Sequence, residues 1–237
     1  MIRKIRNKIL FFISISIFLM EVVSATDIAY VLKNPSNPNV QFVEIMRELN
    51  YTYNLIDDSQ VSSTNFSKYK MILLGNENIV GVPVDKYSSL IVNPDYYSNW
   101  SRSRVTITGN QPLTAINRNS TSRITNGIGL EFQVYTRGGV STPMYLLSGQ
   151  KSSGVAKIVT TNDLSQYIIA TKTNPRKVFF GITESNYWTN DSKKLFKNSI
   201  KWVIEGDEVN KAPVLKQNIP TLEWNTGRTL QINLNDY

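Results

Sequence analysis

Apolar residues recur along the chain in two kinds of pattern, one typical of strands and one typical of amphipathic helices. The order of these patterns predicts a layered α/β domain. Short apolar or alternating runs predict strands at residues 27–32, 51–56, 71–74 and 90–92. Between the first two, Asn39 can cap a helix from about Val40 to Leu49, on which Phe42 and Met46 share one apolar face. A β-α-β order of this kind predicts a parallel sheet with right-handed crossovers.

The middle of the chain, from about residue 105 to 173, changes character. Turns rich in Ser, Thr, Asn and Gly separate short β-prone runs, and no helix longer than a turn near Ile124 is expected. The runs are residues 105–108, 130–135, 144–147, 156–160 and 167–171. We expect these strands to extend the sheet and to add a peripheral antiparallel layer.

The last strong signal is a strand followed by an amphipathic helix. Residues 177–182 (KVFFGI) predict a buried strand, and Thr189 or Asn190 can cap a helix from about Asp191 to Ile204. Gly206 is placed to end this helix. Lysines 193, 197 and 201 form a stripe on it, which we interpret as a solvated face rather than a binding patch.

The two ends of the chain predict separate segments. Residues 1–25 combine basic positions, an apolar run and small residues at 23–25, a pattern typical of a secretory signal. The expected domains are therefore a signal peptide at 1–25, an α/β domain at 26–206, a linker at 207–213 and the beginning of a β-sandwich module at 214–237. The alternating strand pattern at residues 230–237 is the basis for the last segment.

Charge and composition exclude several classes of function. The 237 residues include 26 basic and 18 acidic side chains, and residues 26–237 keep 22 and 17 of them, a net charge of +5. These charges are dispersed and accompany no nucleic-acid-binding motif, so nucleic acid is not an expected partner. The chain contains no histidine and no cysteine, which removes the commonest general base and the strongest soft nucleophile.

Export, if it occurs, would permit glycosylation. Asn-x-Ser/Thr sequons stand at Asn50, Asn65, Asn99, Asn119 and Asn190. The expected localisation is secreted or cell surface, with glycans or other cell-surface proteins as partners. Contact with a membrane is expected only through the export signal or a C-terminal anchor beyond residue 237.

Several segments resemble the class I glutamine-amidotransferase-like family, which has a flavodoxin-type fold, and its trehalose-utilisation-like relatives. The resemblance rests on DIAYVL with its following helix, YTYNLIDDSQV, FSKYKMILLGN, SSLIVN and KVFFGITESNYWTNDSKKLFKNSIKWVI. It implies an α/β fold, a mainly parallel sheet with helices on both faces and a β-rich middle insertion. The segment from Ala212 to Tyr237 similarly resembles the opening of a cadherin-like or immunoglobulin-like surface module.

The resemblance also implies a catalytic site that this chain cannot build. In the family a Cys follows a central strand, with a His and an acid nearby; here the corresponding turns are residues 74–77 and 92–95, which contain no Cys. Without a His anywhere to activate a Ser, no catalytic residue carries over, and enzymatic activity is the less favoured expectation. No cofactor or metal is expected either, because phosphate-loop, dinucleotide and EF-hand motifs are missing.

Polar and aromatic residues follow the predicted parallel strands, where ligands of open α/β sheets collect. The candidate ligand-binding residues are Asp57, Asp58, Asn76, Glu77, Asp95, Glu184, Tyr187 and Trp188. Carboxylates, amides and rings on one edge suit a sugar. The alternative is that the polar residues only form loops, while Tyr187 and Trp188 close the core.

These observations favour a non-catalytic binding or structural module that forms the N-terminal part of a larger surface protein. The alternative is a carbohydrate-active enzyme, or a sugar-binding protein, that uses the carboxylates and aromatics at the strand ends. Hydrolysis would pair Asp57 and Asp58 with Glu77 or Glu184 across a glycosidic bond.

Overall fold

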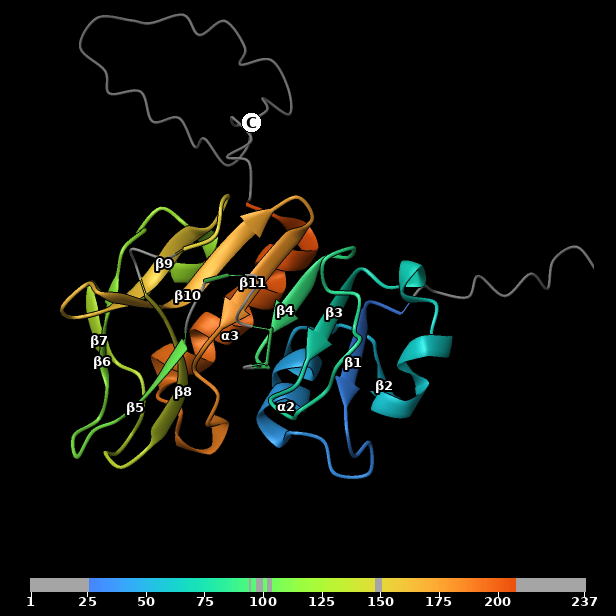
Figure 1. Ribbon diagram of the computed structural model, residues 1–237, viewed down its shortest axis with the longest axis horizontal. Coiled ribbons are helices and arrows are strands. Elements are labelled where there is room, and N and C mark those ends of the chain that lie inside the picture. The colour runs from blue at the N-terminus through green and yellow to red at the C-terminus, as the bar shows by residue number, and fades with distance from the viewer. Residues whose placement is uncertain (1–25, 94, 97–99, 102–103, 148–150, 208–237) are drawn as a thin grey trace, which may run out of the picture.

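The protein, described by a computed structural model, folds around one mixed sheet (Figure 1). The structure describes residues 26–207 except 94, 97–99, 102–103 and 148–150. Five parallel strands form one half of the sheet in the order β2-β1-β3-β4-β11. They are β1 (Ile28–Leu32), β2 (Tyr53–Asp57), β3 (Met71–Leu74), β4 (Ser89–Ile91) and β11 (Arg176–Phe180). This half confirms the expected flavodoxin-like arrangement.

The middle of the chain builds the other half of the sheet. Strand β10 (Gln166–Thr173) pairs antiparallel with β11, and β9, β6 and β7 continue outward from it. Their bounds are β9 (Ala156–Thr161), β6 (Thr114–Asn117) and β7 (Glu131–Gln133). Strand β8 (Ser141–Leu147) pairs with the first residues of β10, and β5 (Arg104–Thr108) pairs with β8. The extension of the sheet predicted from the sequence is therefore confirmed.

The cover of the parallel half differs between its two faces. Helices α2 (Val40–Glu48) and α3 (Asn190–Glu205) both lie on one face, where the Phe42 and Phe196 rings stack with centroids 4.5 Å apart. The 3₁₀ segments η1 (Asp58–Ser63) and η2 (Phe66–Lys68) cover the opposite face. The same face receives residues 75–88, which connect β3 to β4 without a helix. The helical cover expected on both faces is thus α-helical on one face only.

The residues predicted to begin and end α3 do so in the structure. The Thr189 hydroxyl accepts a hydrogen bond from the Ser192 N–H at 3.2 Å, so Thr189 is the N-cap. Gly206 ends the helix with φ +86°, a conformation that only glycine adopts without strain. The lysine stripe is exposed or half-buried, and Lys197 pairs with Glu48 of α2 at 2.9 Å. This stripe therefore helps to join the two helices at the surface.

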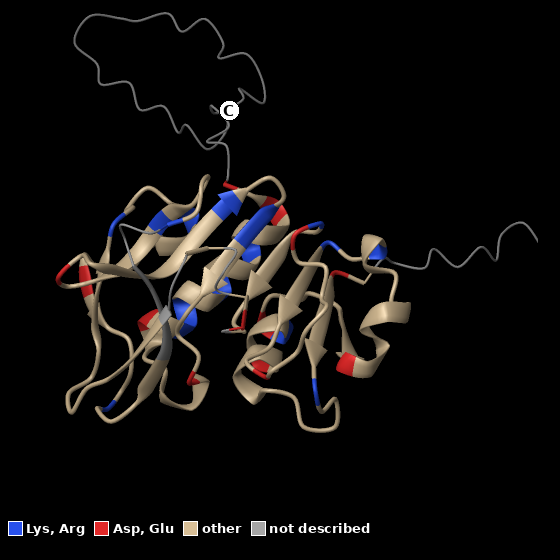
Figure 2. Cartoon of the chain, viewed as in Figure 1, with Lys and Arg blue, Asp and Glu red and all other residues tan. Residues whose placement is uncertain are grey.

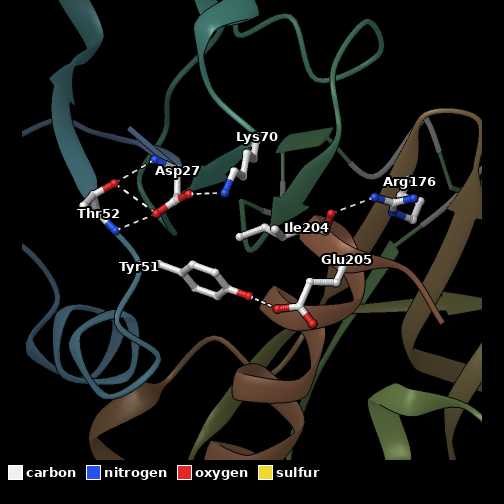
Figure 3. Close-up of polar contacts among 7 residues, drawn as sticks. All are labelled: Asp27, Tyr51, Thr52, Lys70, Arg176, Ile204 and Glu205. Carbon is white, nitrogen blue, oxygen red and sulfur yellow. Dashed lines mark hydrogen bonds and ion pairs between the residues drawn. The ribbon is translucent and has the colours of Figure 1, made fainter. Parts of the chain in front are cut away.

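Polar side chains connect the amino end of the parallel strands to the end of α3 (Figure 3). The Asp27 carboxylate accepts hydrogen bonds from the Thr52 N–H at 2.9 Å and the Thr52 hydroxyl at 3.0 Å. It also pairs with the Lys70 ammonium at 2.6 Å. The Tyr51 hydroxyl donates to Glu205, whose carboxylate also pairs with the Arg123 guanidinium. We call these residues the amino-end cluster.

The Arg176 side chain completes this end of the molecule. Its guanidinium donates to the backbone carbonyl of Val203 at 2.9 Å and to that of Ile204 at 2.8 Å; Figure 3 shows the second of these contacts. Carbonyls in the last turn of a helix have no partner within the helix, and a cation there also interacts favourably with the helix dipole. Arg176 thereby fixes the C-terminus of α3 against the start of β11.

Acid is expected to weaken the amino-end cluster. Partial burial raises the pKa of Asp27 and Glu205, but the hydrogen bonds and ion pairs described above outweigh it and hold both pKa values below their ordinary range. Such carboxylates contribute stability above their unfolded pKa of about 4 and lose it as pH falls through the folded pKa. The free energy of unfolding should therefore fall below about pH 4, and less steeply in an Asp27→Asn/Glu205→Gln variant. Urea denaturation across this pH range measures both slopes; equal slopes would contradict the assignment.

Some expectations concern residues outside the described range. The signal segment 1–25, most of the linker and the β-sandwich segment 214–237 all lie there. Within the part of the chain that the structure describes, no helix has both the length and the apolar character needed to cross a membrane.

Candidate functional site

The turn after β3 is one of the two turns at which the resemblance places a catalytic nucleophile; the other, residues 92–95, is described only in part because residue 94 lies outside the described residues. Gly75, Asn76 and Glu77 follow the buried strand directly, and Asn93 after β4 holds the turn by donating to the Glu77 carbonyl at 2.6 Å. A nucleophile elbow is a strained turn that leads into a helix. Here residues 75–88 form no helix, and among the described residues only Asn50 and Leu164 are non-glycines with a left-handed φ. The turn therefore lacks both the side chain and the backbone geometry of an elbow.

The Glu77 side chain folds back over this turn. A Cβ placed on Gly75 would lie 2.2 Å from Glu77 Oε2 and 3.4 Å from Tyr30 Cε2, so only glycine leaves room for the carboxylate. Oε2 is buried and has no hydrogen-bond partner. Desolvation raises the pKa of Glu77, and the Asp58 charge adds to the effect while Lys33 opposes it. This oxygen is enclosed by the protein, so the flexible end of the Glu77 side chain has to move outward before the oxygen can accept a hydrogen bond from a ligand.

A line of polar groups runs from Glu77 across the carboxyl edge of the sheet. The Tyr30 hydroxyl accepts a hydrogen bond from the Asn39 N–H at 3.4 Å, and the Asn39 amide donates to the Ser185 hydroxyl at 2.8 Å. Asn39 also caps α2 through the Phe42 N–H. Burial and the charge of Glu77 raise the pKa of Tyr30, so this phenol stays neutral. These groups connect the end of β1 to the turn after β11.

The turn after β11 continues the line. Glu184 is half-buried, and its charge acts on the buried Tyr135, whose pKa is raised mainly by desolvation. The neighbouring Thr183 hydroxyl is buried without a hydrogen-bond partner. Tyr187 is half-buried under the Arg137 guanidinium, which lies 4.1 Å from its ring centroid. We call this set of polar groups the carboxyl-edge line; its members are Glu77, Tyr30, Asn39, Ser185, Thr183 and Glu184.

The sequence-predicted site residues divide into three groups. Glu77 and Glu184 lie in the carboxyl-edge line, with Asn76, Asp58 and Tyr187 beside it. Asp57 caps η1, where its carboxylate accepts two hydrogen bonds from Ser59, and these lower its pKa. Asp95 is exposed on the turn after β4. The contacts of Asp57 are those of a loop-forming residue.

Trp188 is corrected from a ligand-binding to a core residue. It is 4% exposed, its indole N–H donates to the Ile182 carbonyl at 3.0 Å, and its ring packs on Phe42 and Phe196. An indole with its polar edge satisfied and its faces covered has nothing left to offer a ligand. The alternative that Trp188 closes the core is the one observed.

The asparagines of the described sequons differ in how exposed they are. Asn50, Asn65 and Asn190 are exposed, whereas Asn119 is half-buried and accepts a hydrogen bond from the Thr121 hydroxyl at 2.9 Å. Asn99 lies outside the described residues.

Sequence reasoning missed a pocket in the antiparallel half. A cavity of about 510 Å³ opens between the β5–β6 connection, at residues 109–113, and the β9–β10 turn. Its lining is uncharged apart from Asp163, and a smaller recess of about 40 Å³ adjoins it. In sequence, the connecting residues resemble any polar loop. The only signal that could have drawn attention to the pocket is the lack of charged residues over positions 105–117.

Within the described residues, no group of three or more acidic side chains lies close enough to hold a metal ion. The carboxyl edge offers carboxylates, amides and hydroxyls, all of which can form hydrogen bonds.

Comparison with known proteins identifies the fold. No protein-family model and no curated protein matches the sequence. A structure described as a ThuA-like protein from Bacteroides uniformis is similar with a TM-score of 0.53 and 12% identity, over 77% of this chain and 92% of that chain. One described as a GMP synthase protein from Thermoplasma acidophilum has a TM-score of 0.52 and 14% identity, over 75% and 94%. The chain has the class I glutamine-amidotransferase-like fold, and at these identities the likeness concerns the fold alone.

A third similar structure corrects the expected localisation. It is described as a cytoplasmic protein from Salmonella typhimurium LT2, with a TM-score of 0.51 and 8% identity over 76% of this chain and all of that chain. That description conflicts with the secreted or cell-surface localisation expected from residues 1–25. The expectation is contradicted and is not carried further; it rested on a local pattern outside the described residues.

Proposed function

We propose that this domain is a non-catalytic binding module that receives its ligand at the carboxyl edge of the parallel strands. The observation that carries the proposal is the turn after β3, where Glu77 with an unpartnered carboxylate oxygen stands in place of a nucleophile on an elbow. With no His or Cys in the chain, the usual groups that activate or replace a nucleophilic Ser are missing as well.

The electrostatics of Glu77 favour a ligand that donates a hydrogen bond. A buried acceptor without a partner destabilises the free protein by about 1–3 kcal/mol, less when it is only partly buried as here. A hydroxyl or ammonium group from a ligand would satisfy this oxygen and remove that cost. The Tyr30 phenol beneath this turn is fully buried and the Asn39 amide is engaged with Ser185 and Phe42, so both support the edge without contacting a ligand. The half-buried Asn76, Glu184 and Tyr187 are the polar side chains beside Glu77 that a ligand with several hydroxyl groups would contact.

Replacing Glu77 with glutamine should separate binding from folding. Because burial raises the pKa of Glu77, the ionised form destabilises the fold above that pKa, and Glu77→Gln should raise the free energy of unfolding at pH 7 by about 1 kcal/mol. The same change should weaken any ligand found in a glycan- and amine-binding screen of the full chain. Thermal denaturation and calorimetric titration measure the two effects.

Asp57→Asn is the matched control for this variant. It removes one negative charge from the same edge, but the Asp57 carboxylate is already engaged with Ser59, so ligand affinity should not change. Gly75→Ala is a second probe, because its methyl group would displace the Glu77 carboxylate without removing its charge. Equal ligand affinity in the wild type, Glu77→Gln and Gly75→Ala would reject the carboxyl edge as the site.

A carbohydrate-active enzyme is the second candidate, favoured by one observation. The raised pKa of Glu77 is the property that a general acid needs, and Glu184 lies farther along the same line as the second acid. If hydrolysis is found with a panel of aryl glycosides, a Glu77→Gln/Glu184→Gln double variant should abolish it. Turnover that survives in this variant would exclude both acids.

A further inference from the structure

The pocket in the antiparallel half is built from segments far apart in sequence. The β5–β6 connection forms one wall, and the end of β9, the following turn and the start of β10 form the other. These elements lie on the left of Figure 1, away from the carboxyl ends of β1 and β3. With a volume of about 510 Å³, the pocket falls within the usual size range of small-molecule sites. None of its lining residues belongs to the carboxyl-edge line.

Its lining is rich in amides and nearly free of charge. Four amide side chains face the cavity: Asn110, Gln111, Asn162 and Gln166. Residues 105–117, which contribute much of the wall, include no charged side chain and are drawn tan in Figure 2. The one carboxylate, Asp163, already accepts hydrogen bonds from Thr161 at 2.5 Å and from the Ser165 hydroxyl at 2.7 Å. The main cavity therefore offers an anionic ligand no counter-charge, and it offers a cationic ligand only the Asp163 carboxylate, which is already hydrogen-bonded.

One amide group in the lining lacks a partner. The Gln166 Oε1 atom is buried and accepts no hydrogen bond. Buried amide oxygens are normally paired. This oxygen is enclosed by the protein, so the Gln166 side chain has to rotate before the oxygen can accept a hydrogen bond from a ligand in the pocket. The other lining amides are exposed and each carries both donor and acceptor atoms, as do the hydroxyl groups of sugars.

Three backbone carbonyls around the pocket are already engaged. The Gly109 carbonyl accepts from the Gly139 N–H at 2.7 Å, and the Leu113 carbonyl accepts from Val134 at 2.8 Å. The Thr161 carbonyl is likewise taken by Leu164, and Pro112 has no N–H to donate. Recognition of an extended peptide relies on such main-chain groups. With these carbonyls engaged, the side-chain amides are prominent among the groups that can pair with a compact ligand.

Apolar residues complete the match to a sugar. Ile107, Pro112 and Leu113 line the cavity, where they can contact the C–H face of a pyranose ring. The adjoining recess of about 40 Å³ extends toward Tyr135 and Thr142, with room for a water molecule or a hydroxymethyl group. Gln111 borders both spaces and can contact a ligand that occupies either of them.

We propose that this pocket binds a neutral mono- or disaccharide, with Gln166 and Gln111 as its main hydrogen-bonding residues. Different residues from those of the carboxyl-edge line form the main cavity, which lies in the inserted antiparallel half of the sheet. The adjoining recess reaches Tyr135 and the charged Arg137, which contact the turn after β11. After rotation of its side chain toward the cavity, the Gln166 oxygen accepts a hydrogen bond from a sugar hydroxyl, and the exposed amides supply further donors and acceptors.

The test is a titration of the full chain with glucose, galactose, N-acetylglucosamine and maltose, followed by NMR and calorimetry. At least one should bind in the millimolar range or tighter and shift the resonances of residues 107–114 and 161–166. Gln166→Leu and Gln111→Ala should each weaken it about tenfold, the size of one or two net hydrogen bonds. Glucosamine and glucuronate, charged analogues of glucose, should bind more weakly than glucose.

Gln60→Leu is the matched control, because Gln60 lines a groove of about 520 Å³ beside the edge strand β2. This variant should leave sugar affinity unchanged. No binding by any of the four neutral sugars, or equal affinity in the wild type, Gln166→Leu and Gln111→Ala, would overturn the proposal. Glu77→Gln distinguishes it from the carboxyl-edge proposal: a sugar lost in Glu77→Gln but kept in Gln166→Leu binds at the edge and not in this pocket.

Discussion

Replacing Trp188 with alanine should lower the free energy of unfolding by about 3–5 kcal/mol, the usual range for a buried large aromatic residue. Its ring lies 5.7 Å from Phe42, 5.6 Å from Phe180 and 5.0 Å from Phe196, measured between centroids. The substitution would leave a cavity where α2, α3 and β11 meet, and it would remove the donor to the Ile182 carbonyl. Urea denaturation followed by far-UV circular dichroism measures the change.

Tyr187→Ala provides the control at the neighbouring position. Tyr187 is half-buried and contacts the Arg137 guanidinium, so its truncation should cost much less than that of Trp188. Ligand affinity, measured below the unfolding transition, should be the same for Trp188→Ala and the wild type. A small loss of stability together with a large loss of affinity would instead return Trp188 to the binding site.

Gly138→Ala should destabilise the antiparallel half and close the sugar pocket proposed above. A Cβ at Gly138 would lie 1.9 Å from the Asn110 carbonyl oxygen and 2.9 Å from the Gln111 backbone nitrogen. Because these are backbone atoms, the β5–β6 connection itself would have to move. We expect a loss of about 1–3 kcal/mol, as for other overpacked sites, and loss of sugar binding although no lining side chain is changed.

Gly139→Ala separates backbone strain from this clash. Gly139 has φ +72°, and a Cβ at this position would have no neighbouring atom within 4 Å, so alanine there should cost only the left-handed penalty of about 1–2 kcal/mol. The shape of the pocket, and therefore sugar affinity, should survive. Chemical-shift mapping of the two variants tests this; equal effects on residues 109–113 would contradict the packing at Gly138.

The fold could be predicted well wherever local physics sets it. Asn39 and Thr189 cap their helices as expected, and Gly206 ends α3, because capping depends only on residues within a few positions of the helix end. The buried parallel strands follow from their continuous apolar runs. The sequence between β3 and β4 contains no helical period, and the structure has no helix there. The resemblance nevertheless implied helices on both faces of the sheet.

From the sequence, only the location of the candidate site at the strand ends could be predicted, and not which of its residues are available to a ligand. Asp57 and Glu77 are both acids directly after parallel strands, yet one is fully engaged with Ser59 while the other is folded over Gly75 with an oxygen unpaired. Their pKa values accordingly shift in opposite directions. A rule that ligands collect at the strand ends selects both residues and cannot distinguish them, since the difference lies in three-dimensional surroundings.

By itself, the sequence determined the class of fold, the ends of both helices, the polar character of the carboxyl edge and the lack of a His or Cys for catalysis. Each of these depends on composition or on spacing over a few residues. Tertiary structure alone decided that Trp188 belongs to the core, that Glu77 keeps an unpaired oxygen, and that residues 109–113 meet the β9–β10 turn around a pocket. These depend on contacts between segments distant in sequence, where burial and hydrogen-bond partners are set by packing and not by the local pattern.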